Sequence, residues 1–253
     1  GMGKSLSRQG GGIPTVEFMN RLGEQPLAFQ PGTHWRYSTC ADVLGAVVEV
    51  VSGKRFGDFL REKIFTPLEM VDTAFYVPES KRDRFVTCYV RGQNGLTPWT
   101  GMHLACGVYD RDPGFESGGA GLVSTLKDYS HFADMLMHGG VWRGRRVLSP
   151  ASVKFLTTPQ LNDVQQRDLW DSLDGYSYGK LCRVCVAPER VAGLALPGEY
   201  GWDGWLGTYL CNFPNEGITL LSMQNTTDCG TSAMVRKVRN VLITAMSKGE
   251  VNI

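Results

Sequence analysis

The sequence has no apolar run long enough to cross a bilayer and no excess of charge of one sign. A membrane-spanning helix needs about 20 successive apolar residues, and the opening GMGKSLSRQGGG lacks the apolar core of a secretion signal. Lysine and arginine together number 26, against 25 aspartate and glutamate residues, and these charges are scattered along the chain. These absences argue against a membrane span, export and nucleic-acid binding, and they favour a small-molecule partner.

Patterns for disulfides, metals and cofactors are also lacking. The seven cysteines are odd in number and widely spread, which is not typical of a disulfide framework and favours a reducing compartment such as the cytoplasm. Cys182 and Cys185 have CxxC spacing, but the surrounding YSYGKLCRVCV is typical of one continuous strand and no further ligands lie nearby in sequence. We therefore expect no metal site and no cofactor. Surface or capping roles are expected for four isolated histidines, His34, His103, His131 and His138.

Apolar residues at helical spacing predict a helix-rich region over about 15–160, after a flexible glycine-rich segment at 1–14. Helices are predicted over 15–23, 42–53, 56–66, 124–139, 149–158 and 232–247. We expect the apolar stripes of these helices to lie in the core. These stripes include Val43, Leu44, Val47, Val48 and Val51 in one helix, and Val235, Val238, Leu242 and Ala245 in the last.

The last third changes to the alternating pattern of strands. YSYGKLCRVCV, LGTYLCNF and GITLLSMQN predict strands within a sheet region over about 175–228, and NFPNEG is typical of a hairpin connection. Helices followed by hairpin-linked strands and a terminal helix predict an α+β fold, in which helices flank an antiparallel sheet. We expect one such domain over 15–253.

Two short motifs carry chemistry. Tyr37-Ser38-Thr39 stands between a Pro-Gly turn and a predicted helix, and Trp202-Asp203-Gly204 stands in a predicted strand. Together with SGGAGLVSTLKDYSHFADMLMHGG, RRVLSPASV and GEYGWDGWLGTYLCNFPNEGITLLSMQN, this order of segments resembles the serine beta-lactamase-like hydrolases. These include class C beta-lactamases, low-molecular-weight penicillin-binding proteins and related esterases. The resemblance runs from about Pro26 to the C-terminal helix, and it implies acyl-enzyme chemistry on a small ester, amide or peptide-like substrate.

The resemblance assigns roles to six residues. Tyr37 is the implied catalytic residue; a phenol is a poor base at neutral pH unless a neighbouring cation shares its proton. Thr39 stands where the family often has asparagine. The implied substrate-binding residues are Thr39, Trp202, Asp203, Gly204 and Trp205. The backbone N–H of Trp205 is the expected oxyanion donor, an interaction worth roughly 3 kcal/mol.

Trp202 replaces a cationic residue of the family motif, which weakens recognition of a beta-lactam carboxylate and makes esters more plausible substrates. Plainer interpretations of these residues stay open. Tyr37 is equally suited to packing against the following helix, and Trp202 and Trp205 to core or rim positions. For Asp203, a local hydrogen bond is favoured over a catalytic proton transfer.

The family's Ser-x-x-Lys nucleophile motif is expected upstream of Tyr37, where the chain has only SLSR at Ser5 to Arg8. Arginine stays protonated and cannot carry the proton. The chain's one Ser-x-x-Lys, Ser124 to Lys127, stands at a predicted helix start, so a capping role is favoured over an unorthodox site.

We therefore expect this chain to be the C-terminal part of such a hydrolase, inactive alone. Loss of the N-terminal portion would expose a sheet edge or apolar helix faces and lead to a homodimer. The alternative hypothesis is a non-catalytic protein that uses an expected cleft between the Tyr37 loop and the Trp202 strand for recognition or assembly.

Overall fold

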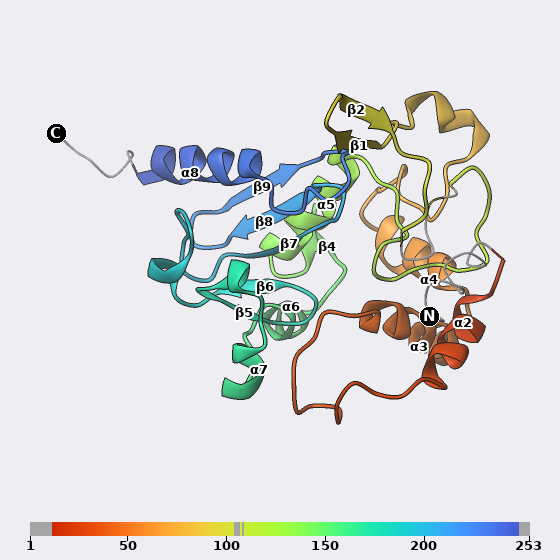
Figure 1. Cartoon of the computed structure of the whole chain (residues 1–253), viewed down its shortest axis with the longest axis horizontal. Coiled ribbons are helices and arrows are strands. Elements are labelled where there is room, and N and C mark those ends of the chain that lie inside the picture. The colour runs from red at the N-terminus through yellow and green to blue at the C-terminus, as the bar shows by residue number, and fades with distance from the viewer. Residues whose placement is uncertain (1–11, 104–106, 108, 248–253) are drawn as a thin grey trace. The chain divides into compact units, whose positions relative to one another are not determined.

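A computed structural model describes residues 12–103, 107 and 109–247 (Figure 1). The chain is divided into two compact units. Unit 1 comprises Gly1–Phe29 and Tyr37–His131, and unit 2 comprises Gln30–Arg36 and Phe132–Ile253. Most of the flexible segment expected at 1–14 lies outside the described residues, and the single domain over 15–253 stays a prediction. No helix in the described ranges is long and apolar enough to cross a membrane.

Unit 1 is mainly helical. Its elements are α2 (Thr15–Gly23), α3 (Cys40–Ser52), α4 (Phe56–Leu60), the π-helical η1 (Arg61–Phe65), the 3-10 helix η2 (Glu79–Arg84), the hairpin β1 (Tyr89–Gly92) and β2 (Gly95–Pro98), and the start of α5 (Leu126–Met137). A small core joins α2 to α3 and to Phe115, which stacks on Phe18 with ring centroids 4.5 Å apart. The helix predicted over 56–66 is α-helical only in its first half, since α4 ends at Leu60 and the π-helical η1 follows it.

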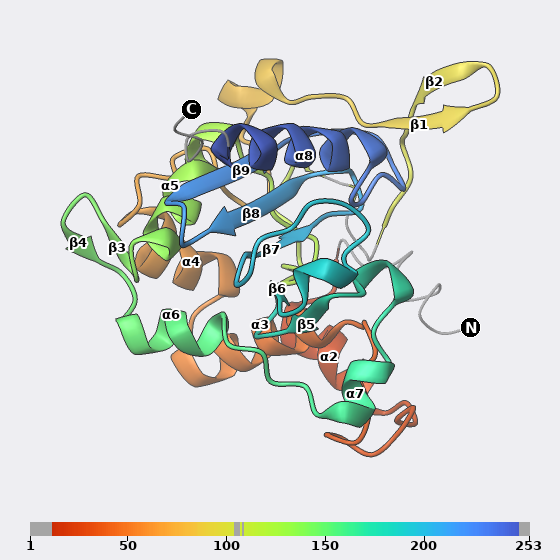
Figure 2. The ribbon, with the colours of Figure 1, turned by 90° about the vertical axis from the view of Figure 1, so that its left-hand side faces the viewer.

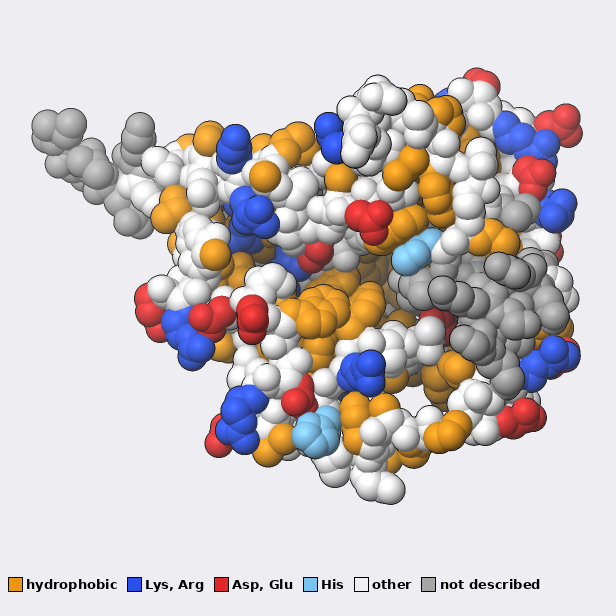
Figure 3. Space-filling model, viewed as in Figure 1, with side chains coloured by type: hydrophobic (Ala, Val, Ile, Leu, Met, Phe, Trp, Pro, Cys, Tyr) orange, Lys and Arg blue, Asp and Glu red, His pale blue; other side chains and the backbone are white. Residues whose placement is uncertain are grey.

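The apolar stripe predicted to bury α3 is exposed instead. Helix α3 buries Asp42, Gly45 and Ala46, and the space above Gly45 is filled by the ring of Phe56, which a Cβ would meet at 3.2 Å. Of the five residues in the predicted stripe, Val48 is half-buried, and the other four have exposed fractions of 42% for Val43, 51% for Leu44, 49% for Val47 and 82% for Val51. The prediction of a core stripe was wrong because small residues, and not valines, face the neighbouring elements. Figure 3 shows how hydrophobic side chains, in orange, are interspersed with charged ones over one face of the molecule.

Unit 2 is built on a five-stranded antiparallel sheet. Its strands are, in spatial order, β5 (Tyr176–Tyr178), β6 (Arg183–Cys185), β7 (Tyr200–Asp203), β8 (Tyr209–Phe213) and β9 (Ile218–Ser222). The other elements are the hairpin β3 (Val141–Trp142) and β4 (Arg145–Arg146), the helices α6 (Pro150–Leu156), α7 (Asp163–Arg167) and α8 (Ala233–Ser247), and the 3-10 turns η3 (Asp171–Leu173) and η4 (Pro188–Arg190). The predicted α+β class with an antiparallel sheet is confirmed.

Helix α8 covers one face of this sheet (Figure 2). Tyr209, Cys211 and Phe213 alternate along β8 and pack with Val235 and Ile243 of α8. On the opposite face of β8, the Asn212 side chain donates a 3.1 Å hydrogen bond to the carbonyl of Ala133 in α5. Successive side chains of β8 therefore point to opposite faces of the sheet, where they contact α8 on one side and α5 on the other.

The buried face of α8 differs from the predicted one. Its fully buried residues are Val235, Arg239 and Ile243, whereas Val238 is 43% exposed. Arg239 is buried because it reaches the carboxylate of Glu199 at 2.7 Å and the hydroxyl of Tyr176 at 3.2 Å. A pattern of apolar residues alone could not indicate an ion pair on the core side of the helix.

The single strand predicted for 176–186 is a hairpin instead. β5 pairs with β6 so that Tyr176 faces Cys185, and Gly179 to Cys182 form the turn. The backbone N–H of Gly179 donates to the carbonyl of Cys182 at 2.8 Å, and Leu181 has a positive φ of 60°. The strand prediction was wrong because the Gly-Lys turn signal lies inside an otherwise strand-like run.

Candidate active site

Tyr37 is the first residue of the second stretch of unit 1, three residues before α3 begins. Its side chain is 46% exposed, so it is not a core residue of unit 1. Thr39 occupies the N-cap position of α3 with φ −81° and ψ 24°, and its side chain makes no capping hydrogen bond. The Tyr37-Ser38-Thr39 turn therefore presents an exposed phenol and a hydroxyl at the N-terminal end of a 13-residue helix.

Neighbouring contacts hold this turn against the rest of unit 1. The buried Asp42 carboxylate accepts hydrogen bonds from the Ser117 hydroxyl and, at 3.1 Å, from the Gly119 backbone. Gly118 lies so close to the start of α3 that a Cβ there would come within 2.3 Å of the Ala41 carbonyl. Gly118 is therefore required for close packing against the helix that follows Tyr37, whereas a Cβ at Gly121 would meet the ring of Phe75 at 2.8 Å and the Ser117 carbonyl at 2.9 Å.

The second motif lies at the end of β7 in unit 2. Trp202 and Asp203 are the last two residues of this strand and pair with Leu210 and Tyr209 of β8. Asp203 accepts a hydrogen bond from the guanidinium of Arg183, whose side chain is 4% exposed. The local bond favoured for Asp203 is therefore present, and it ties the motif to the neighbouring strand β6.

Gly204 and Trp205 lie in a turn, and the expectation that they continue the strand was wrong. Gly204 donates a backbone hydrogen bond to Thr208 at 2.8 Å and accepts one from Gly207 at 2.8 Å. A Cβ at Gly204 would come within 2.3 Å of the Thr208 hydroxyl, so a larger residue there would require the Thr208 side chain to rotate away. The indole of Trp205 donates to the Asp228 carboxylate at 2.6 Å. The oxyanion role of the Trp205 backbone stays a prediction.

Ser124 and Thr125 stand at the start of α5. The Thr125 hydroxyl accepts a 3.1 Å hydrogen bond from the Asp128 backbone, as an N-cap does, and the Ser124 hydroxyl lies 2.8 Å from that of Thr73. Asp128 is buried, with 1% of its surface exposed, and its carboxylate accepts a 2.9 Å hydrogen bond from the same Thr73 hydroxyl. This hydrogen-bonding network fits the capping interpretation of Ser124 to Lys127.

The CxxC pair lies in the β5–β6 hairpin. Burial raises the pKa of Cys182 and of Cys185 to about 11, so both thiols are protonated at neutral pH. In the part of the chain that the structure describes, no group of three or more His, Cys, Asp and Glu side chains is placed to hold a metal ion. His34, His131 and His138 each make a hydrogen bond within their own unit, to Asp168, Leu68 and Asp134.

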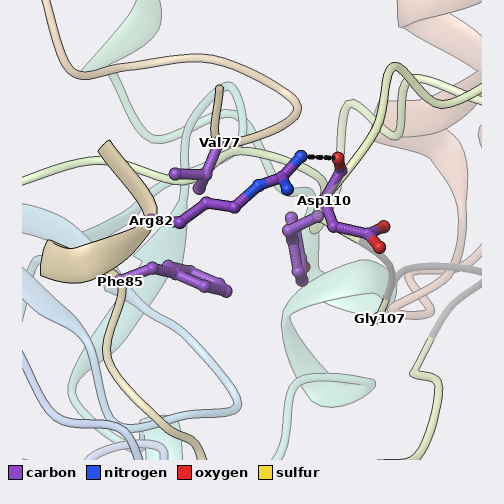
Figure 4. A pocket seen from close by; sticks show the side chains of 6 residues that line it. Val77, Arg82, Phe85, Gly107 and Asp110 are labelled. Carbon is purple, nitrogen blue, oxygen red and sulfur yellow. Dashed lines mark hydrogen bonds between the residues drawn. The ribbon is translucent and has the colours of Figure 1, made fainter. Parts of the chain in front are cut away.

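A hollow of about 370 Å³ opens in unit 1 (Figure 4). Arg82 lies across it and donates to the carbonyl of Asp110, while the rings of Phe85 and Tyr109 are 5.6 Å apart. Neither Tyr37 nor Thr39 is among its lining residues. It is therefore distinct from the candidate catalytic turn.

Comparison with known proteins settles the family. The family profile described as Beta-lactamase matches residues 5–244. This chain belongs to the beta-lactamase family. The chain is 45% identical over 201 residues to the lovastatin esterase of Penicillium rubens, with 77% of this chain and 48% of that protein aligned. It is 34% identical over 234 residues to the esterase EstB of Burkholderia gladioli, with 85% and 56% aligned.

Solved structures show the same fold. EstCE1, a hydrolase with promiscuous acyltransferase activity, superposes with a TM-score of 0.72 at 21% identity, covering 85% of this chain and 57% of that one. The simvastatin synthase LovD of Aspergillus terreus, as the LovD6 mutant, also has a TM-score of 0.72, at 17% identity with 97% and 66% covered. The chain spans about half the length of the curated relatives it matches.

The structure places the six predicted site residues in two groups. Tyr37 and Thr39 belong to unit 1, and Trp202, Asp203, Gly204 and Trp205 belong to unit 2. Sequence reasoning missed two features beside the second group, namely the buried Arg183 and the aromatic rings that surround Trp202. An arginine between apolar residues in LCRVCV was the available signal for the first; for the rings there was none, because they are far apart in sequence.

Proposed function

We propose that this chain forms part of a serine hydrolase that makes and breaks an acyl-enzyme on a small ester, amide or peptide-like substrate. The observation that carries the proposal is the exposed Tyr37 phenol directly before α3, at the position of the family's Tyr motif. Tyr37 assists proton transfer, and the backbone N–H of Trp205, in the turn after Gly204, is the donor for the oxyanion.

Esters are the favoured substrates within this proposal. Trp202 provides an apolar wall where a cation would recognise a carboxylate, and the adjacent Asp203 is already paired with Arg183. Two relatives are named esterases, which supports the same choice. Thr39 contributes a hydroxyl in place of an amide for binding the substrate carbonyl.

The attacking hydroxyl, in this proposal, lies on polypeptide outside these 253 residues. Ser124 is the alternative within the chain, but its hydroxyl is engaged with Thr73 and its neighbour Thr125 caps α5. The chain alone is then expected to be inactive. A longer protein that also contains the residues encoded upstream of this chain, called the upstream-extended protein, is expected to be active.

A covalent serine probe tests this assignment. We expect a fluorophosphonate to label the upstream-extended protein, and to label its Ser124→Ala variant equally, while the present chain stays unlabelled. Ester hydrolysis should likewise occur with the upstream-extended protein and its Ser124→Ala variant, and not with the present chain. If neither version is labelled and no ester is cleaved, the hydrolase proposal fails and the alternative of a binding or assembly protein stands. Loss of labelling in Ser124→Ala alone would assign the nucleophile to Ser124.

We also propose that the chain by itself forms a homodimer through an exposed edge of its sheet. In unit 2 the edge strands are β5 and β9. The carbonyls of Tyr176 and Tyr178 in β5 already accept hydrogen bonds from Gln166 and Gln160, so β9 is the edge proposed to pair with another strand. The exposed valines of α3 offer a second apolar surface. Sedimentation at high protein concentration should show a dimer, and a clean monomer would contradict the proposal. Val47→Lys separates the two surfaces, since it disrupts only a dimer formed through α3.

A reducing compartment, with the cytoplasm favoured, remains part of this proposal. Its support is that six cysteines in the described part of the chain are free thiols.

A further inference from the structure

Four aromatic side chains of unit 2 are joined in a loop of ring contacts, in which each ring touches at least two of the others. Trp35 contacts Trp170 with centroids 5.5 Å apart at 82° and Tyr178 at 5.4 Å and 65°. Trp202 completes the set, 5.3 Å from Tyr178 at 83° and 6.4 Å from Trp170 at 37°. Such edge-to-face and tilted pairs are the favourable geometries for aromatic rings. We call these four residues the aromatic cluster.

Hydrogen bonds fix the segment that brings Trp35 into the cluster. The Asp168 carboxylate accepts from the Trp35 backbone N–H at 2.9 Å and lies 2.9 Å from Nδ1 of His34. Gln165 of α7 donates to the Gly32 carbonyl at 2.9 Å. The Trp35 N–H, and then His34, lower the pKa of Asp168, so this carboxylate is ionised at neutral pH. The cluster is therefore organised before any ligand arrives, which lowers the entropic cost of binding.

The aromatic cluster is more exposed than the core beside it, although Trp202 packs against the buried Leu173, Tyr176 and Cys185. Trp170 is 46% exposed and the other three rings are partly exposed, whereas the core tyrosines Tyr176 and Tyr209 of the same sheet are 6% and 3% exposed. Partly exposed indole surface in contact with water is unfavourable by about 25 cal/mol per Å². Rings held in place with apolar surface exposed can stack against a flat apolar group of a ligand.

The position of the cluster connects it to the candidate active site. Trp202 is the first residue of the Trp202-Asp203-Gly204 motif, and the guanidinium of Arg183 lies 5.8 Å from its ring. Arg183 lies over one side of the Trp202 ring and is paired with Asp203. A second cation on that side would lie close to the guanidinium of Arg183. A neutral, flat apolar group is the ligand that these contacts favour.

We propose that the aromatic cluster binds a flat apolar part of the substrate, such as an aryl or fused-ring group of an ester, and thereby selects the substrate class. This proposal rests on the function proposed above and names the substrate of that same site. Trp170 is the specificity-determining residue, because it is the most exposed ring, and Asp168 is a positioning residue that holds Trp35.

Calorimetric titration of the present chain tests the binding without requiring turnover. We expect methyl naphthyl ether to bind more tightly than methyl cyclohexyl ether, and Trp170→Ala to weaken naphthyl binding by about ten- to hundred-fold. Trp170→Phe should restore most of the affinity. The matched control is Phe155→Ala, which removes another exposed ring of unit 2, 58% exposed on α6, and should leave binding unchanged.

Three results with the ligands and Trp170→Ala would overturn the proposal, and a fourth would come from the control. They are equal binding of the two ethers, an unchanged affinity in Trp170→Ala, and tighter binding of choline than of the naphthyl ether, which would make the cluster a cation site. A loss of affinity in Phe155→Ala as large as that in Trp170→Ala would also overturn it, because the effect would then be non-specific.

Turnover separates this inference from the hydrolase proposal. In the upstream-extended protein, Trp170→Ala should raise KM for naphthyl acetate and leave KM for ethyl acetate unchanged. If the naphthyl ether binds as expected but no ester is cleaved and no serine is labelled, the hydrolase proposal fails and the aromatic binding surface stands. If both esters are cleaved equally well with and without the Trp170 ring, the hydrolase stands and this inference falls.

Discussion

Arg239→Met is expected to lower the free energy of unfolding of this chain by about 3–5 kcal/mol, the range for removing one partner of a buried ion pair. Glu199 is 1% exposed, and Arg239 reaches its carboxylate at 2.7 Å. Without Arg239 the carboxylate keeps the Tyr176 hydroxyl at 2.6 Å and the Leu196 N–H at 3.0 Å but loses its counter-charge. Urea unfolding followed by circular dichroism measures the change.

Two further variants make the Arg239 result specific. Arg236→Met changes an exposed arginine of the same helix, whose one described partner is the Thr231 carbonyl at 3.0 Å, and should alter stability by less than about 0.5 kcal/mol. The double variant Arg239→Met with Glu199→Met should recover much of the lost stability, since well-packed apolar residues often replace a buried pair without cost. Equal effects of Arg236→Met and Arg239→Met would show that the ion pair is not the cause.

Tyr37→Phe is expected to reduce kcat for ester hydrolysis in the upstream-extended protein by about 100- to 10,000-fold, the contribution of a positioned proton-transfer group. The substitution removes one oxygen from a side chain that is 46% exposed, so stability should change little. Stopped-flow hydrolysis of an aryl ester measures kcat and KM separately. A large fall in kcat with little change in KM is the signature of a group that acts in the transition state.

The matched control for this prediction is Tyr76→Phe. Tyr76 also belongs to unit 1 and is 39% exposed, so it loses a similar hydroxyl without involving the Tyr motif. We expect its kcat to equal that of the unsubstituted protein. If Tyr37→Phe retains full kcat, Tyr37 is a structural residue that packs near α3, and the catalytic assignment is wrong.

Local patterns predicted most of the helices and the class of the fold. Turn residues and periodicity act within a few positions, so the start of α2 at Thr15 and the antiparallel pairing of β8 with β9 across NFPNEG could be predicted. Local patterns failed where a neighbour far along the chain decides the outcome. Most valines of α3 are exposed because Gly45 and Ala46 lie on the packed side of the helix. Helix α8 buries Arg239 because its guanidinium binds the carboxylate of Glu199, the residue directly before β7.

The candidate site divides in the same way. The motifs around Tyr37 and Trp202 are contiguous strings, and the family they indicated is confirmed by the match over residues 5–244. The roles of Tyr37, Thr39, Trp202, Asp203, Gly204 and Trp205 stay predictions. The partners that surround them, Arg183 beside Asp203 and the rings of Trp170 and Tyr178 beside Trp202, belong to no motif and could not be predicted from any short segment.

The sequence by itself determined the family, the α+β class and the positions of the two motifs, because each depends on residues that are neighbours along the chain. Only the tertiary structure decided that Arg183 holds Asp203, that Arg239 neutralises Glu199 and that four aromatic rings meet. The Trp35 backbone and the Asp168 carboxylate are 133 residues apart in sequence yet 2.9 Å apart in space. Contacts of this kind form only in the folded protein, because packing brings a carboxylate or an indole next to residues that are distant in sequence. Periodicity in the sequence reflects the order of neighbouring residues and so does not indicate these contacts.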